Sequence, residues 1–218
     1  MNTASIDNIQ LWGETLRFAV ELAGTAAFAL SGVLVGAQKR LDAVGVCVVG
    51  FLAAFGGGTL RDLLLDQRPF FWVRHVDMLW GVLALCLLAM LFMRSRHFDL
   101  TRKAIEWPDA LGLGLFTATG VHQALMGQMP GLVAALMGVI TGVFGGVLRD
   151  IVCNEIPAAF SDHRPYAVCA LAGGFAYVGL WHLDAPGWVS LLSCIVITAG
   201  FRGLAVWRNW NLPAWQVD

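Results

Sequence analysis

Two short stretches of the chain combine residue types that could do chemistry inside an apolar protein. The first is Gly-Gly-Gly-Thr-Leu-Arg-Asp at 56–62, and the second is Gly-Gly-Val-Leu-Arg-Asp at 145–150. Glycine costs roughly 1 kcal/mol relative to alanine within a helix, so these runs should loosen or break one. Carbonyl oxygens freed there could replace part of a cation's hydration shell. The glycines Gly56, Gly57, Gly58, Gly145 and Gly146 therefore predict a pathway, with close helix packing as the alternative.

An arginine and an aspartate follow each glycine run, as Arg61-Asp62 and Arg149-Asp150. Neighbouring residues of a helix point about 100 degrees apart, so we expect each side chain to bond another helix or freed backbone rather than its neighbour. A charge deep in a bilayer costs a few kcal/mol or more. The four charges therefore either line the pathway or anchor the ends of their helices, and the sequence leaves both interpretations open.

Three further sets of residues stand near these motifs. Pro69 and Pro157 follow the Arg-Asp pairs by seven residues and are predicted to end the helices. Glu21, near the start of the first apolar run, is either a carboxylate that draws cations toward a mouth or an interfacial carboxylate. His75 and His163 are expected in loops, as solvated side chains or as proton sensors.

The composition sets the class of protein. The chain has 218 residues, of which 58% are hydrophobic and 13% charged, with a mean hydropathy of +0.69. This apolar excess predicts an integral membrane protein, and the net charge of −1 gives no reason to expect nucleic acid as a partner. No pattern of a catalytic triad, nucleotide loop or metal-ligand cluster is present, so the sequence predicts neither an enzyme nor a cofactor.

Apolar runs long enough to cross a bilayer as helices, which takes about 20 residues, number seven. They fall near 18–37, 41–65, 76–93, 109–126, 131–152, 166–182 and 188–206. The connections are short apart from 94–108, and the polar ends are too small to be domains. We therefore expect an all-α protein in which residues 1–218 form a single membrane domain.

The chain repeats itself at a shift of 88 residues, the separation of Asp62 from Asp150. Without a gap, the shift also places Glu21 on Asp109, Gly57 on Gly145, Gly58 on Gly146, Arg61 on Arg149 and Pro69 on Pro157. The repeats are predicted at about 18–93 and about 106–182, with an extra helix at about 188–206. Because each repeat holds three spans, an odd number, the second must enter the membrane from the opposite face.

The distribution of lysine and arginine predicts the orientation. Four arginines fall on the amino-terminal side of the predicted spans, whereas most basic residues fall on the other side. Basic residues are retained in the cytoplasm. The amino terminus is therefore expected outside and the carboxyl terminus in the cytoplasm.

With the duplicated glycine and Arg-Asp motifs, the prolines at 69 and 157, and seven predicted spans, the chain resembles the trimeric intracellular cation (TRIC) channel family. Its bacterial branch is also labelled a glycine transporter or UPF0126 family. The resemblance implies a bacterial inner-membrane homotrimer in which each subunit has its own pore, lined by the second and fifth helices. It also implies that these helices kink at Gly56, Gly57, Gly58, Gly145 and Gly146. The Lys-Glu-Val motif of animal members is absent, so their phosphoinositide regulation is not expected.

The function expected from these observations is a monovalent cation channel for potassium and also sodium. The alternative is a secondary transporter of glycine or a similar small zwitterion, because inverted repeats with broken helices are equally typical of transporters. A membrane scaffold without transport is the third hypothesis. The expected partners are membrane lipid, the permeating ions and two further copies of the chain.

Overall fold

A computed structural model describes residues 3–94, 102–161 and 164–211, and within these ranges all regular structure is α-helical. Seven helices are long and two are short. The long ones are α1 (Thr3–Gln38), α2 (Ala43–Leu64), α4 (Val76–Arg94), α5 (Arg102–Met126), α6 (Gly131–Val152), α8 (Ala167–His182) and α9 (Gly187–Arg208). The short ones are α3 (Phe71–Arg74) and α7 (Ala158–Ser161). The prediction of an all-helical protein is confirmed for this part of the chain.

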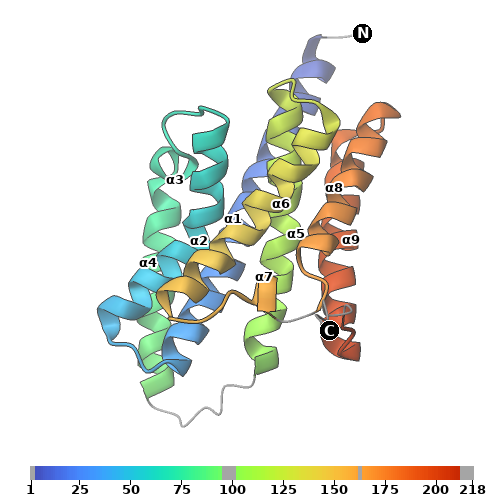
Figure 1. Cartoon of the computed structure of the whole chain (residues 1–218). Helices are drawn as coiled ribbons and strands as arrows, with labels where there is room; N and C mark the ends of the chain where they lie inside the picture. Colours follow the sequence, from blue (N-terminus) through green and yellow to red (C-terminus); the bar gives the residue numbers. More distant parts are fainter. Residues whose placement is uncertain (1–2, 95–101, 162–163, 212–218) are drawn as a thin grey trace.

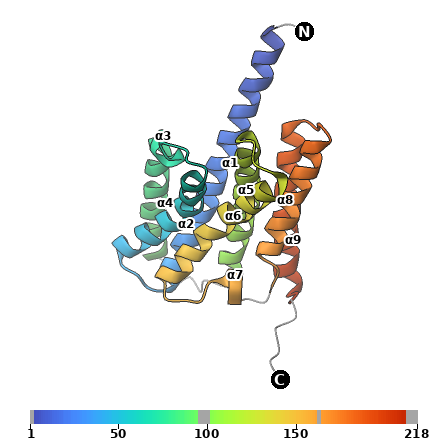
Figure 2. The same cartoon turned by 45° about the horizontal axis from the view of Figure 1, so that its top comes forward.

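The helices form one bundle with a central group of four. Helices α1, α2, α5 and α6 pack against one another, α4 covers α1 and α2, and α8 packs on α5 and α6 beside α9 (Figure 1). Helices α3 and α7 lie at opposite ends of the bundle, and the amino-terminal part of α1 extends beyond it (Figure 2). The carboxyl ends of α2 and α6, which carry the Arg-Asp pairs, therefore point in opposite directions.

Four helical segments of the described chain are long and apolar enough to cross a membrane. They are Thr15–Gln38, Ala43–Leu64, Gly131–Val152 and Gly187–Arg208, and shorter apolar segments occur at Val76–Leu91 and Ala167–His182. Each of the seven predicted runs lies on one long helix. Two helices begin earlier than predicted: α1 starts at Thr3, and α5 starts at Arg102 and continues through Pro108.

The ends of α2 and α6 are set by left-handed residues rather than by proline. Asp66 and Asn154 have φ values of 51° and 57°, and each follows the last helical turn. The next amide, of residue 67 or 155, then donates to a carbonyl five residues earlier, which satisfies the end of the helix. Pro69 and Pro157 lie beyond this turn, so the prediction that they end the helices is wrong.

The glycines do not break their helices. Helix α2 runs without interruption through 56–58, and α6 runs through 145–146. The prediction of a broken helix is therefore wrong, because tight packing of neighbouring helices, described below, holds the backbone in the helical form despite glycine's low propensity. The kink expected from the resemblance stays a prediction.

Candidate functional site

Helices α2 and α6 touch at the paired glycines. A Cβ atom built on Gly57 would lie 2.0 Å from the carbonyl oxygen of Thr141, and one on Gly145 would lie 2.4 Å from that of Ala53. No side chain fits in either position, because the atom it would meet is backbone. Residues 57 and 145 are therefore glycine so that the two helices can approach closely, which is the packing alternative stated above.

The following glycine in each repeat makes room for an aromatic side chain. A Cβ on Gly58 would overlap the ring of Phe71, at the start of α3. A Cβ on Gly146 would lie 3.1 Å from the hydroxyl of Tyr166, just before α8. Gly56 instead faces Leu148 of α6. Gly58 and Gly146 thus leave space for the side chains of Phe71 and Tyr166, which lie beside the polar groups at the two ends of the crossing.

One polar cluster, which we call the α3-side network, consists of Glu21, Arg61, Asp62 and Gln123. All four are buried, with exposed fractions between 0% and 8%. Arg61 Nη1 donates to Glu21 Oε1 at 3.2 Å, and Gln123 Nε2 donates to the same oxygen at 2.8 Å. Arg61 Nε donates to Asp62 Oδ1 at 2.9 Å. The network therefore ties α1, α2 and α5 together at the α3 end of the bundle.

The second cluster, the α7-side network, consists of Ser31, Asp109, Arg149, Asp150 and Tyr166, all buried. Arg149 Nη1 donates to Asp109 and to Ser31, and Tyr166 donates its hydroxyl proton to Asp109 Oδ2 at 2.6 Å. Arg149 Nε donates to Asp150 Oδ1 at 2.8 Å. The α7-side network therefore joins four parts of the chain at the α7 end of the bundle: α1, α5, α6 and the residue before α8.

The aspartate of each pair also holds a short helix. Asp62 Oδ2 accepts from the backbone N–H of Phe71 at 2.7 Å, and Asp150 Oδ2 accepts from that of Ala158 at 2.9 Å. These amides begin α3 and α7 and have no partner within their own helices. Asp62 and Asp150 thus each cap the short helix that follows in their repeat, α3 or α7.

The expectation that the adjacent charges would not pair is wrong. In both repeats the arginine bonds the aspartate that follows it, because its long side chain reaches around the helix despite the divergence of the two Cβ atoms. The expectation of bonds to other helices is confirmed, since each arginine also reaches a carboxylate 40 residues earlier, Glu21 or Asp109. Glu21 is 6% exposed and is bonded to Arg61 and Gln123, so it is not a free carboxylate, and its role at a mouth or at the membrane interface stays a prediction.

Each network holds two carboxylates and one arginine, a formal charge of −1. Removing an arginine from water is costly unless it is paired, and here both carboxylates lie within ion-pair distance of the guanidinium. The arrangement leaves one excess negative charge at each end of the α2–α6 crossing. Such a site favours cations over anions.

The α3-side network also borders a polar cavity of about 100 Å³. Besides Glu21, Arg61, Asp62 and Gln123, its lining includes Arg17, Arg74 and His75. His75 lies between α3 and α4, half-buried, with its ring 4.7 Å from that of Phe18. His163 lies outside the described residues.

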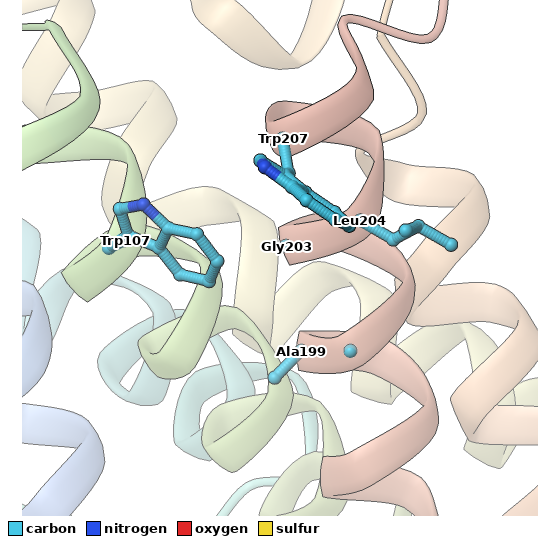
Figure 3. Close-up of a pocket in the computed structure, with 6 residues that line it drawn as sticks. Trp107, Ala199, Gly203, Leu204 and Trp207 are labelled. Carbon is cyan, nitrogen blue, oxygen red and sulfur yellow. The ribbon is translucent and has the colours of Figure 1, made fainter.

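A second hollow is apolar. The groove between α5 and α9 has a volume of about 460 Å³, and Figure 3 shows Trp107 of α5 directed toward Gly203 of α9. Its other lining side chains include Leu204 and Trp207. No charged side chain lines it, so it offers nothing to hold an ion.

Four residues of the site were not predicted from the sequence, namely Arg17, Ser31, Gln123 and Tyr166. Gln123 carried a usable signal, because a polar amide inside a predicted span is expensive unless it has a role. At the α7 end, Lys39 forms an ion pair with Glu155, and this hydrogen bond raises the pKa of Lys39 above its ordinary value. Among the described residues no group of three or more metal-binding side chains is found.

A family model described as a glycine transporter matches residues 18–94 and 106–182, two segments that begin 88 residues apart. The chain is 34% identical to a UPF0126 membrane protein of Vibrio cholerae, over 97% of this chain and 88% of the relative. It is also 34% identical to the UPF0126 inner membrane protein YadS of Escherichia coli K12, over 93% and 98% of the two chains.

Solved structures share this fold as well. The TRIC trimeric intracellular cation channel orthologue from Rhodobacter sphaeroides superposes with a TM-score of 0.82 at 32% identity, over 89% of this chain and 99% of that one. The chain belongs to the bacterial branch of the TRIC channel family. A prokaryotic TRIC channel crystallised in 0.5 M KCl gives a TM-score of 0.84 at 28% identity, over 91% and 100%.

Membership of the TRIC family makes the chain a bacterial membrane protein of a channel class, as the sequence predicted. The structural relatives are channels, which are not enzymes. The label of the matching family model, glycine transporter, differs from the names of the solved TRIC structures.

Proposed function

We propose that the protein is a monovalent cation channel that conducts potassium and also sodium. Each protomer of a homotrimer would have its own pore, passing the glycines of α2 and α6. The observation that carries the proposal is the pair of buried networks, each with a formal charge of −1, at the two ends of the α2–α6 crossing. The names of the related structures, which are trimeric cation channels, support it.

Conduction along this route requires α2 and α6 to separate, because their backbones are in contact at Gly57 and Gly145. No side chain at either glycine interlocks the helices and resists that movement. The carbonyl oxygens of Ala53 and Thr141 face the glycines across the contact. These oxygens would border the gap and could take the place of water around a dehydrated cation.

We further propose seven membrane spans in one domain, arranged as two inverted repeats of three and a seventh helix. The two matched segments of equal length and the positions of α3 and α7 at opposite ends of the bundle support this arrangement. The bias of lysine and arginine supports an amino terminus outside and a carboxyl terminus in the cytoplasm.

Planar bilayers containing the purified protein, under a potassium chloride gradient, test the function. The proposal predicts discrete unitary currents that reverse near the equilibrium potential of potassium. Currents that reverse near the chloride potential, or no unitary currents at all, would refute it.

The label of the matching family model favours a second candidate, a secondary transporter of glycine or a similar zwitterion. The protein reconstituted in liposomes then accumulates glycine when a gradient of the driving ion is applied, without unitary currents. Liposome uptake and bilayer recording on the same preparation separate the two candidates.

A further inference from the structure

Helix α9 lies outside the two repeats and carries a buried arginine. Arg202 is 2% exposed and falls within the apolar run predicted at 188–206. A charged side chain inside a membrane span is costly, and it usually marks a functional contact with a nearby group. The contacts of Arg202 therefore indicate what the seventh long helix adds to the repeats.

Arg202 contacts the two residues that precede α8. Its Nη1 donates to the carbonyl oxygen of Pro165 at 3.1 Å, and its guanidinium carbon lies 4.7 Å from the centre of the Tyr166 ring. A cation over an aromatic ring is attracted to it, more strongly where water is excluded. Tyr166 is 3% exposed, so water is excluded here. Arg202 thus holds both the backbone and the ring at the start of α8.

The hydroxyl of Tyr166 lies at the α7 end of the α2–α6 crossing. It donates to Asp109 Oδ2 at 2.6 Å, and a Cβ atom built on Gly146 would lie 3.1 Å from it. Gly146 follows Gly145, the glycine at which α6 contacts α2. A route that passes these glycines toward α7 therefore meets the phenol of Tyr166 and the carboxylate to which it is bonded.

The two ends of the crossing differ in this respect. The four members of the α3-side network belong to α1, α2 and α5, and the aromatic ring beside them, that of Phe71, has no hydroxyl. The guanidinium over that ring is that of Arg61 itself, at 5.2 Å. The contact that α9 makes through Arg202 therefore acts on the α7 end.

We propose that Arg202 is a positioning residue that holds the Tyr166 hydroxyl on Asp109 and so keeps the α7 end of the crossing closed. This inference rests on the proposed conduction past the glycines of α2 and α6. When the hydroxyl leaves Asp109, the phenol clears the exit beside Gly146 and the carboxylate faces the passing cation. Weakening the hold of Arg202 then favours the open state. The unitary current stays unchanged, because Arg202 acts through Tyr166 and not on the ion.

Single-channel recording in planar bilayers measures the ratio of open to closed time. Tyr166→Phe keeps the ring and removes a hydrogen bond to a carboxylate, so this ratio should rise about tenfold or more. Arg202→Gln should raise it at least about threefold, with an unchanged unitary current. Arg208→Gln is the matched control, because Arg208 lies on the same helix, 6.0 Å from the ring of Trp207 and outside the α7-side network. It should change the ratio less than about twofold.

A double variant separates positioning from a general structural role. If Arg202 acts through the Tyr166 hydroxyl, adding Arg202→Gln to Tyr166→Phe should change the ratio of open to closed time less than about twofold. An arginine that only stabilised the packing of α9 would instead add its full effect to that of Tyr166→Phe.

Hydrogen exchange tests the same contact without a current. The amides of Cys169 and Ala170 donate to the carbonyl oxygen of Tyr166, so their exchange reports how firmly the start of α8 is held. In Arg202→Gln these amides should exchange at least about threefold faster than in the wild type. In Arg208→Gln they should exchange at the wild-type rate.

The inference is overturned if Arg202→Gln and Arg208→Gln give the same ratio of open to closed time, or if the effects of Arg202→Gln and Tyr166→Phe add in full. It is also overturned if the α8 amides exchange alike in both arginine variants. Absence of unitary currents in the wild type refutes the proposed function instead, and the exchange rates then still decide whether Arg202 holds Tyr166.

Discussion

Replacing Gly57 with alanine should destabilise the protein, although alanine is the better helix former. The new Cβ would lie 2.0 Å from the carbonyl oxygen of Thr141, whereas ordinary contact begins at 3.4 Å, so α2 and α6 must separate by about 1.4 Å. Overpacking of this kind costs roughly 1–3 kcal/mol, and the upper value applies because backbone cannot turn aside. After the gain of about 1 kcal/mol in helix propensity, the net loss is about 2 kcal/mol.

Thermal unfolding in detergent micelles measures this loss. A chain of this length shifts its midpoint by roughly 2–4 °C per kcal/mol, so Gly57→Ala should unfold about 4–8 °C lower. Gly81→Ala is the matched control, because no atom lies within 4 Å of its Cβ position on α4. It should unfold at the wild-type temperature or slightly above it. If Gly57→Ala is as stable as Gly81→Ala, the glycine is not required for the helix contact and our account of the crossing fails.

Three further changes test the networks and the helix ends. Asp109→Asn leaves buried Arg149 with one carboxylate instead of two and should cost about 3 kcal/mol, seen as a lower unfolding temperature; an unchanged temperature would contradict the ion pair. Asn154→Ala should cost about 1 kcal/mol because residue 154 has φ 57°, whereas Asn154→Gly should not lower the unfolding temperature; equal losses would argue against the left-handed turn. The pKa of Lys39 is raised by Glu155, so the ion pair stabilises the fold at neutral pH and this contribution is lost as the pH rises through the raised value. Lys39→Gln should therefore unfold at a lower temperature than the wild type at pH 7. This difference in unfolding temperature should shrink only in alkaline buffer, as the pH rises through the raised pKa.

The sequence was enough to locate the elements and half of the site. Apolar runs placed the seven long helices, and the shift of 88 residues related Glu21 to Asp109 before any geometry was known. These two predictions need only the local composition of the chain and a comparison of the chain with itself. The glycine positions were found in the same way, although their effect was misjudged.

What the sequence could not supply depended on tertiary contacts. Helix propensity predicts a break at three glycines, but packing of α6 against α2 overrides it. Spacing on an ideal helix separates Arg61 from Asp62, but burial beside Glu21 leaves the guanidinium few other partners, and its length lets it reach both. Gln123 acquires meaning only when α5 places it against α1, more than 100 residues away in the chain.

The central claim is that ions cross the protein at the contact of α2 and α6, and thiol modification of the open channel tests it most directly. In a background without the five native cysteines, Leu148→Cys places a thiol on α6 at the position that faces Gly56 of α2, and Thr198→Cys places one at a fully buried position of α9. A positively charged methanethiosulfonate reagent, added while unitary potassium currents are recorded, should irreversibly reduce the current of Leu148→Cys and leave that of Thr198→Cys unchanged. An unaffected Leu148→Cys current, or a loss confined to Thr198→Cys, would show that the ions take another route.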